Sequence, residues 1–347
     1  MTGRERVLAA LRREEPDRVP YCEIGVDPAM AARLCGWSVA AEDASGDVDE
    51  AFNIEESPYT AEQAVALADH LHLDNLYYVM RAPVFTDKRA GKHGRLFYAD
   101  GRIASVADVE AMQLPDPRHP TALAKARGFV EATGERASFL ISRAGIFSTV
   151  LSLGWEPFSY ALYDDRELVE RLLDRYSTWT LEMARRYCHL GFDVFCSTDD
   201  MAFRTGPFFS PQLFRELVLP HLRRLAEVVT IPWVVHSDGD ISPLLDDLCD
   251  LGVAGIHPVE NGAMDIRAVK RRYGDRLCLL GNVDLNILGT GPPQVVTDAV
   301  RGLIRDAAPG GGYIVSSGNS LAGYLIPDNV EAMTAAVRQF GRYPIEA

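Results

Sequence analysis

The feature that most constrains the fold of this 347-residue chain is a repeated alternation of short apolar runs with amphipathic helical patterns. The runs are too uniformly apolar for a sheet with one face in water, which indicates a parallel sheet covered by helices on both faces. Eight such runs occur, at residues 19–25, 73–79, 138–142, 192–197, 233–236, 254–257, 277–281 and 313–316.

Helical patterns follow most of these runs, and they are clearest at residues 166–189, 211–229, 241–251, 264–273, 293–307 and 329–340. Eight strand-and-helix units predict a single (β/α)8 TIM barrel, which occupies residues 1–347 as one domain. An open doubly wound sheet is the alternative fold, but no GxGxxG motif follows any of the predicted strands.

Two additions to the barrel are expected. Thr2 and Glu5 form a capping-box pattern that opens a short amphipathic helix at the N-terminus. Residues 80–137 form a long insertion between the second and third strands, and residues 97–102 within it have the pattern of a small hairpin. We expect this insertion to form a wall or lid over the mouth of the barrel.

Charge and composition exclude several classes of partner. The formal net charge is -14, and the longest run of lysines and arginines is the three residues Lys270–Arg272, so nucleic acid and anionic membranes are not expected partners. No apolar stretch approaches the roughly 18 residues of a membrane span. The N-terminus lacks a signal-peptide pattern and the six cysteines are scattered, so we expect a cytoplasmic protein with reduced thiols.

Polar side chains follow each predicted strand. In a barrel the carboxyl ends of the strands meet on one face, where catalytic groups concentrate. The residues at these ends are Glu23, Asp27, Tyr77, Tyr78, Arg81, Ser142, Arg143, Thr198, Asp199, Asp200, His236, Asp238, Asp240, His257, Glu260, Asn261, Asn282, Asp284, Ser316 and Asn319.

The stretch from Val234 to Asp240 is the most informative of these ends, because an apolar strand leads there into an imidazole and two carboxylates beside a glycine. This pattern is typical of a metal site or of a general acid–base pair. Glu260 follows the neighbouring strand and needs a partner for its charge, so we predict that His236, Asp238 and Glu260 bind a metal. The alternative is that Asp238 and Asp240 cap the next helix while His236 bonds to a backbone carbonyl.

Asp199 and Asp200 are adjacent at the end of the fourth strand, so their side chains point in different directions. We predict that one carboxylate faces the pocket and acts in catalysis, while the other caps a helix or accepts loop amides. Arg143 ends the third strand and is predicted to hold a substrate anion; a salt bridge to either aspartate is the alternative.

Further side chains are candidates for contact with the substrate. Tyr77 and Tyr78 alternate across the second strand, so one of them faces inward, and we assign Tyr78 to the pocket wall. Asn282 and Asp284 are predicted to orient a ligand, although an Asx turn after the seventh strand explains them equally well. Arg81 and Asn319 complete the predicted substrate-binding set.

Several motifs resemble those of the uroporphyrinogen decarboxylase superfamily, and together they extend over essentially the whole chain. They are Met1–Leu11 with Pro16–Pro20, Asp199-Asp200 followed by Gly206-Pro207, Ser210-Pro211, Phe214-Arg215 and Leu219-Pro220, then His236–Gly239, Gly281–Asp284 and Pro327–Met333. The resemblance implies a (β/α)8 barrel, an enzyme, and a homodimer of the kind common among the decarboxylases. The superfamily contains both decarboxylases and cobamide-dependent methyltransferases.

Resemblance to the decarboxylases implies arginines after the first strand and a histidine near the end of the eighth. Here no basic residue lies between Arg18 and Arg33, and Glu23 and Asp27 occupy that region instead. Asn319 stands near the position of the expected histidine. These departures count against uroporphyrinogen, a substrate with many carboxylates.

Resemblance to the methyltransferases implies a zinc bound by His-x-Cys and a later cysteine. His236 matches the first ligand, Asp238 replaces the first cysteine, and Asn319 lies near the second. Zinc accepts carboxylate oxygen as well as imidazole, so this harder set still fits zinc. Such a zinc is a stronger Lewis acid and activates thiols less well, which favours polarisation of an O-methyl or N-methyl donor.

The first hypothesis is therefore a zinc-assisted methyltransferase that moves a methyl group between a small O-methyl or N-methyl compound and a corrinoid, which is either free or carried by a separate corrinoid protein. His236 and Glu260 would hold the metal, with Asp238 either as the third ligand or as a group that orients the ligands. Asp200 and Asn282 would position the substrate.

Two other hypotheses stay open. One is a cofactor-free decarboxylase that acts on a tetrapyrrole or a smaller acid, in which Arg143 or Arg81 binds the carboxylate and Asp199 or Asp200 stabilises positive charge. The other is a corrinoid- or tetrapyrrole-binding protein without catalytic activity.

Overall fold

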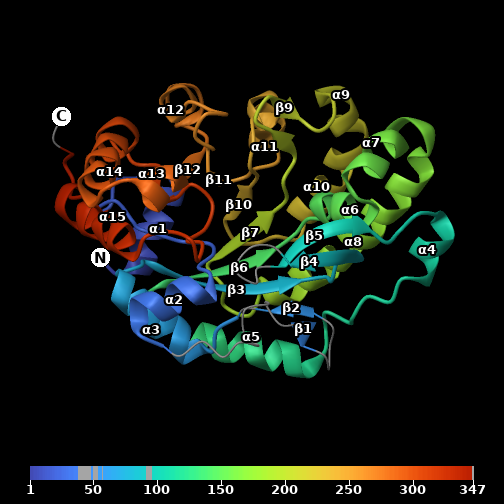
Figure 1. The fold of residues 1–347 in the computed structure, drawn as a ribbon, viewed down its shortest axis with the longest axis horizontal. Helices are drawn as coiled ribbons and strands as arrows, with labels where there is room; N and C mark the ends of the chain where they lie inside the picture. Colours follow the sequence, from blue (N-terminus) through green and yellow to red (C-terminus); the bar gives the residue numbers. More distant parts are fainter. Residues whose placement is uncertain (38–47, 50–53, 57, 91–95, 346–347) are drawn as a thin grey trace.

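The protein is described here by a computed structural model that covers residues 1–37, 48–49, 54–56, 58–90 and 96–345. A curled sheet lies at the centre, and helices surround it on the outside (Figure 1). Among the described residues, no helix is both long enough and apolar enough to cross a membrane.

Seven parallel strands form the sheet within the part of the chain that the structure describes, and each strand pairs with the next along the chain. They are β3 (Asn75–Arg81), β6 (Ala137–Ser142), β7 (Val194–Thr198), β10 (Trp233–His236), β11 (Gly255–His257), β12 (Cys278–Val283) and β13 (Tyr313–Ser317). A doubly wound sheet reverses its strand order at a switch point. The order here never reverses, so the open doubly wound alternative is wrong.

The first predicted strand, residues 19–25, is not a strand in the structure. Its backbone pairs with β13 only at isolated positions, where Val315 donates to the Pro20 carbonyl at 2.9 Å and Cys22 donates to Val315 at 3.0 Å. On the other side the side chain of Asn75 replaces a backbone ladder, because it accepts from the Glu23 amide and donates to the Glu23 carbonyl. Pro20 has no amide hydrogen, which also interrupts a regular ladder.

Small strands flank the sheet. β1 (Val48–Asp49) and β2 (Ile54–Glu56) extend it antiparallel beside β3. In the insertion, β4 (Thr86–Ala90) and β5 (Leu96–Gly101) form an antiparallel pair. After β7, the short strand β8 (Ala202–Phe203) pairs with β9 (Gly206–Pro207). Gly101 lies so close to the end of the helix α6 (Ile146–Leu153) that a Cβ there would be 2.1 Å from the Leu153 carbonyl carbon. The β4–β5 hairpin therefore packs against the helix that follows β6.

Helices cover the outer face of the sheet. They are α1 (Gly3–Leu11), α2 (Pro28–Cys35), α3 (Ala61–Leu71), α4 (Val106–Ala111), α5 (Pro120–Ala132), α6 (Ile146–Leu153), α7 (Trp155–Asp164), α8 (Arg166–Tyr187), α9 (Pro211–Leu213), η2 (Phe214–Val218), α10 (Leu219–Ala226), η3 (Ser242–Leu244), α11 (Leu245–Asp250), α12 (Ile266–Tyr273), α13 (Leu285–Thr290), α14 (Pro293–Ala307) and α15 (Pro327–Phe340).

The N-terminal capping box is present, since Thr2 accepts from the Glu5 amide and Glu5 accepts from the Thr2 amide. The helix predicted at residues 211–229 is divided into α9, the π-helical turn η2, and α10. Pro220 lies at this junction and cannot donate an i to i−4 hydrogen bond, so the wider turn before it is a physical consequence of the sequence.

Candidate functional site

A cavity of about 450 Å³ opens at the carboxyl ends of the parallel strands. Its walls come from segments that are far apart in the chain, including the loop after residue 23, the β4–β5 hairpin and the ends of β3, β6, β7 and β10. The lining residues are Ile24, Gly25, Val26, Pro58, Tyr77, Val79, Arg81, Tyr98, Arg143, Phe147, Thr198, Asp200, His236, Asn319 and Ser320.

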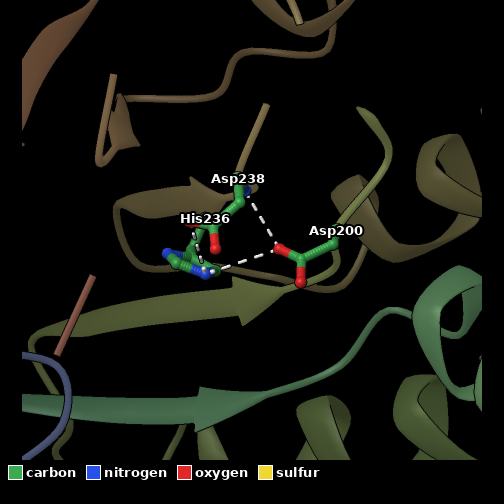
Figure 2. Close-up of side chains that lie close together, drawn as sticks. All are labelled: Asp200, His236 and Asp238. Carbon is green, nitrogen blue, oxygen red and sulfur yellow. Dashed lines mark hydrogen bonds and ion pairs between the residues drawn. The ribbon is translucent and has the colours of Figure 1, made fainter. Parts of the chain in front are cut away.

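Asp200, His236 and Asp238 form a cluster at the wall of this cavity, with one ligand-type atom from each within 4.8 Å of the others. Figure 2 shows Asp200 and His236 pointing toward one another, with Asp238 beside them. His236 Nε2 lies 3.6 Å from Asp200 Oδ1 and 3.9 Å from Asp238 Oδ1. Asp200 Oδ1 also accepts from the Asp238 amide at 3.0 Å, which fixes the two loops relative to each other.

The two carboxylate oxygens of Asp238 have different surroundings. Oδ2 accepts from the Asn319 side chain at 2.6 Å, whereas Oδ1 is buried and has no hydrogen-bond partner within the described residues. Burial raises the pKa of Asp238 to about 6; the charges of Asp200 and Glu260 act in the same direction, and His236 acts against them. A carboxylate oxygen that is buried without a donor would be stabilised by a cation.

Glu260 does not join the cluster, in contrast to the ligand set predicted from the sequence. Its carboxylate accepts from the Gly239 amide at 2.6 Å and lies 3.9 Å from the Arg204 guanidinium. Gly239 has φ +83, and a Cβ there would lie 2.4 Å from the Ala202 carbonyl oxygen. Glu260 therefore secures the tight turn after Asp238, and Asp200 stands where Glu260 was expected.

Asp199 points away from the cavity and is almost fully buried. Its carboxylate accepts from the backbone amides of Ala144, Gly145 and Phe147, the last two at 3.1 Å. Helix α6 begins at Ile146 and has no capping side chain of its own, so Asp199 caps this helix from another strand. Burial raises the pKa of Asp199, while the three amides and the charge of Arg143 lower it. Asp199 therefore positions the start of α6, whereas Asp200 faces the pocket.

Two guanidinium groups, those of Arg81 and Arg143, also line the cavity. Arg81 donates to Thr198 Oγ1 at 2.9 Å, and Arg143 donates to the Tyr98 hydroxyl at 3.2 Å. The Arg143 guanidinium also lies over the rings of Tyr98 and Phe147, at 5.8 and 5.9 Å from their centroids. Within the described residues, Arg143 forms no salt bridge with Asp199 or Asp200, although its charge lowers the pKa of Asp199.

Tyr77 lines the cavity and Tyr78 does not, so the assignment of Tyr78 to the pocket wall is wrong. Tyr78 packs on the outer face of the sheet, with ring centroids 5.3 Å from Phe129 and 6.0 Å from Phe192. Tyr77 instead accepts from the Val26 amide at 2.8 Å and holds the loop that forms one wall. Side chains alternate between the two faces of β3, so one of the two tyrosines had to face inward. The sequence did not show which of the two it was.

Asn282 and Asp284 lie outside the cavity lining. The Asn282 side chain donates to the Val259 carbonyl at 2.5 Å, and Asp284 caps α13 by accepting from the Asn286 amide at 2.8 Å. The alternative given for them, an Asx turn, describes Asp284, whereas the Asn282 side chain bonds to the loop after β11. Asn319, in contrast, lines the cavity and orients Asp238.

Two buried groups below the cavity were given no role from the sequence. His257 Nδ1 lies 2.7 Å from His236 Nδ1, and burial followed by the charge of His236 lowers the His257 pKa well below its usual value. Glu23 is fully buried, and burial raises its pKa to about 7 against the hydrogen bonds from Ser317 that lower it. The parallel register of β10 and β11, which pairs His236 with His257, is the signal that could have found the histidine pair.

A curled parallel sheet with a polar cavity at the carboxyl ends of its strands is the arrangement of α/β proteins that bind small molecules at those ends. The chain belongs to the uroporphyrinogen decarboxylase family, because the model of that family, described as uroporphyrinogen decarboxylase (URO-D), matches residues 94–340. The members of this family to which the chain is similar are enzymes, either decarboxylases or methyltransferases.

Individual relatives include both kinds. The uroporphyrinogen decarboxylase of Methylibium petroleiphilum is 29% identical over 37% of this chain and 34% of its own length. The methylcobamide:CoM methyltransferase MtaA of Methanosarcina barkeri is 28% identical over 49% of this chain and 48% of its own. The matched segments thus span about a third to a half of these relatives.

A solved structure described as a methyltransferase from Methanosarcina mazei covers 98% of this chain and 99% of its own, with a TM-score of 0.74 and 22% identity. At this identity the likeness shows the fold.

Proposed function

We propose that this protein is a metal-dependent enzyme that moves a methyl group between a small O-methyl or N-methyl compound and a corrinoid, with the metal bound by Asp200, His236 and Asp238. The observation that carries the proposal is the buried Asp238 Oδ1, which has no hydrogen-bond partner within the described residues and lies 3.9 Å from His236 Nε2. The similarity to a protein named methylcobamide:CoM methyltransferase supports the reaction class.

The residues present fit a divalent metal such as zinc. Two ligands about 2.1 Å from a tetrahedral zinc lie about 3.4 Å apart. The distances from His236 Nε2 to Asp200 and Asp238 are 3.6 and 3.9 Å, so small side-chain movements would complete the shell. One nitrogen and two carboxylate oxygens are ligands that zinc accepts, and an open fourth position on the cavity side would receive the substrate.

A metal in this shell would act as a Lewis acid on the oxygen or nitrogen that carries the methyl group. The protein's own residues would do the rest. Arg81 and Arg143 would hold an anionic part of the methyl donor, Asn319 would keep Asp238 turned toward the cavity, and Phe147 and Tyr98 would limit water at the mouth.

The whole chain is proposed to be one domain in which the segment after Val19 stands in for the eighth strand of a (β/α)8 barrel. Its contacts with β13 on one side and with Asn75 on the other support this proposal.

Metal content is the first test. Protein purified without chelators is analysed by mass spectrometry, and about one metal per chain is expected for the wild type. Asp200→Asn and Asp238→Asn should lose the metal. Glu260→Gln is the matched control, since this carboxylate lies beside the cluster but is bonded to Gly239 and Arg204. Loss of metal in Glu260→Gln with retention in Asp200→Asn would refute this ligand set.

Turnover is the second test. Metal-loaded enzyme is mixed without oxygen with a reduced corrinoid and a panel of methyl ethers and methylamines, and the corrinoid spectrum reports methylation. Methylation by the wild type and none by His236→Gln is the expected outcome. No methylation with any donor and a metal-free wild-type protein would overturn the proposal.

A second candidate function is the decarboxylation of a small carboxylic acid, which the placement of Arg81 and Arg143 in the cavity wall favours. Release of carbon dioxide would then persist after removal of metal and would be abolished by Arg143→Ala. Methyl transfer, in contrast, would be abolished by removal of metal, so a chelator separates the two functions.

A further inference from the structure

A continuous chain of buried polar groups leads from the cavity into the centre of the sheet. His236 contacts His257 through their Nδ1 atoms at 2.7 Å, and His257 Nε2 lies 3.1 Å from Ser316 Oγ. Ser316 Oγ donates in turn to Glu23 Oε2 at 3.5 Å. The four side chains come from β10, β11, β13 and the segment after Val19, and Glu23 and His257 are almost fully buried.

The Nδ1–Nδ1 contact can contain only one hydrogen when both rings are neutral, so it leaves two arrangements. In the first, His236 donates from Nδ1 and keeps a bare lone pair on Nε2, on the side of Asp200 and Asp238. In the second, His257 donates, and the hydrogen of His236 then sits on Nε2. Only the first arrangement leaves His236 Nε2 able to bind a metal, because a metal-bound imidazole nitrogen carries no proton.

Glu23 decides between the two arrangements. As a carboxylate it can only accept, and it already accepts from Ser317 through the amide at 2.9 Å and the hydroxyl at 2.6 Å. The Ser316 hydroxyl has one proton and two neighbours, Glu23 Oε2 at 3.5 Å and His257 Nε2 at 3.1 Å. The carboxylate is the stronger acceptor of the two because it is charged, so Ser316 donates to Glu23 and its lone pair faces His257 Nε2. His257 is kept neutral by its burial, which lowers its pKa, so it then carries its one hydrogen on Nε2 and its Nδ1 accepts from His236.

We propose that Glu23, Ser316 and His257 are positioning residues that hold His236 in the Nδ1-protonated tautomer and turn the Nε2 lone pair toward Asp200 and Asp238. The use of that lone pair for a metal rests on the proposed function, whereas the tautomer itself does not. Outer partners of this kind fix ring orientation and ligand basicity at metal sites in general.

The tautomer is measured directly by nitrogen NMR of metal-free protein labelled with 15N-histidine, in alkaline buffer well above the pKa of Glu23. The His236 signals are identified by their disappearance in His236→Gln. The expected spectrum shows a protonated Nδ1 and an unprotonated Nε2 for His236. A proton on Nε2 of His236 would overturn the proposal, whether or not the protein binds metal.

Ser316→Ala and Ser317→Ala form a matched pair, because both hydroxyls are buried and bond to Glu23 but, of the two hydroxyls, the one bonded to His257 Nε2 is that of Ser316. Ser316→Ala should give a mixture of His236 tautomers and about a tenfold weaker metal affinity, at the lower end of the range for outer-partner changes. Ser317→Ala should keep the wild-type tautomer and affinity. Equal effects of the two substitutions on the tautomer would refute the role of Ser316.

The two readouts also separate this inference from the proposed function. If His236 shows the expected tautomer while titration with zinc detects no binding, the metal-dependent function fails and the positioning chain stands. If zinc binds and Ser316→Ala changes neither tautomer nor affinity, the metal site stands and the positioning chain is wrong.

Discussion

Asp199 and Asp200 are adjacent in sequence, yet the structure gives them opposite tasks, and a pair of alanine substitutions tests this. Asp199→Ala removes the acceptor of three backbone amides at the start of α6. Asp200→Ala removes a hydrogen bond from the Asp238 amide and a contact with His236. The first change should lower stability, and the second should remove the metal.

The magnitude for Asp199→Ala follows from the amides it leaves behind. A buried amide without an acceptor costs about 1–3 kcal/mol, so three of them give at least about 3 kcal/mol. Removing a carboxylate whose pKa is raised by burial offsets part of this, which is why the lower end applies. At about 2 °C per kcal/mol, the lower end of the range for larger domains, the midpoint of thermal unfolding should fall by about 6 °C.

Thermal unfolding is followed by circular dichroism in metal-free buffer, so that binding does not add to the stability of the wild type. Asp200 is half-buried and makes one backbone contact, so Asp200→Ala should stay within about 1 kcal/mol of the wild type while losing its metal. Equal midpoints for the two variants, or metal loss in Asp199→Ala at full stability, would show that these roles are assigned wrongly.

Three further perturbations are predicted. Glu23→Gln should remove a pH dependence of the free energy of unfolding. The pKa of Glu23 is raised from 4.5 to about 7, so between these values the folded wild type binds a proton that the unfolded chain releases. The contribution of Glu23 to stability is therefore fully present below pH 4.5 and is lost as the pH rises through 7. Urea unfolding should show that difference as about 3 kcal/mol between wild type and variant, and a parallel pH profile for the two would contradict it. Tyr77→Phe leaves the Val26 amide without its acceptor and should lower the free energy of unfolding by about 1–3 kcal/mol; an unchanged denaturation midpoint would speak against this. Gly239→Ala places a Cβ 2.4 Å from the Ala202 oxygen at φ +83, so it should displace Asp238 and reduce metal content, whereas Gly302→Ala, with open space at its Cβ, should not.

The sequence alone determined the number and place of the parallel strands after the first, because an apolar run bounded by polar residues is a local property. The seven strands begin and end within a few residues of the predicted runs. The prediction of a strand at residues 19–25 was wrong, because the side chain of Asn75 in β3 makes the hydrogen bonds that a neighbouring backbone would make in a regular sheet. No local sequence pattern reveals such an arrangement.

Which residues form the site depends on the directions in which their side chains point, and the sequence alone does not give these directions. Tyr77 and Tyr78 differ only in which face of β3 they occupy, and Asp199 and Asp200 differ only in the turn of the chain after β7. The sequence placed imidazole and carboxylates at the same edge of the sheet, because parallel strands end together. Tertiary structure decided that Asp200 and not Glu260 joins His236 and Asp238, and that His257 lies behind them, because loop direction and strand register arise only when the strands pack against one another.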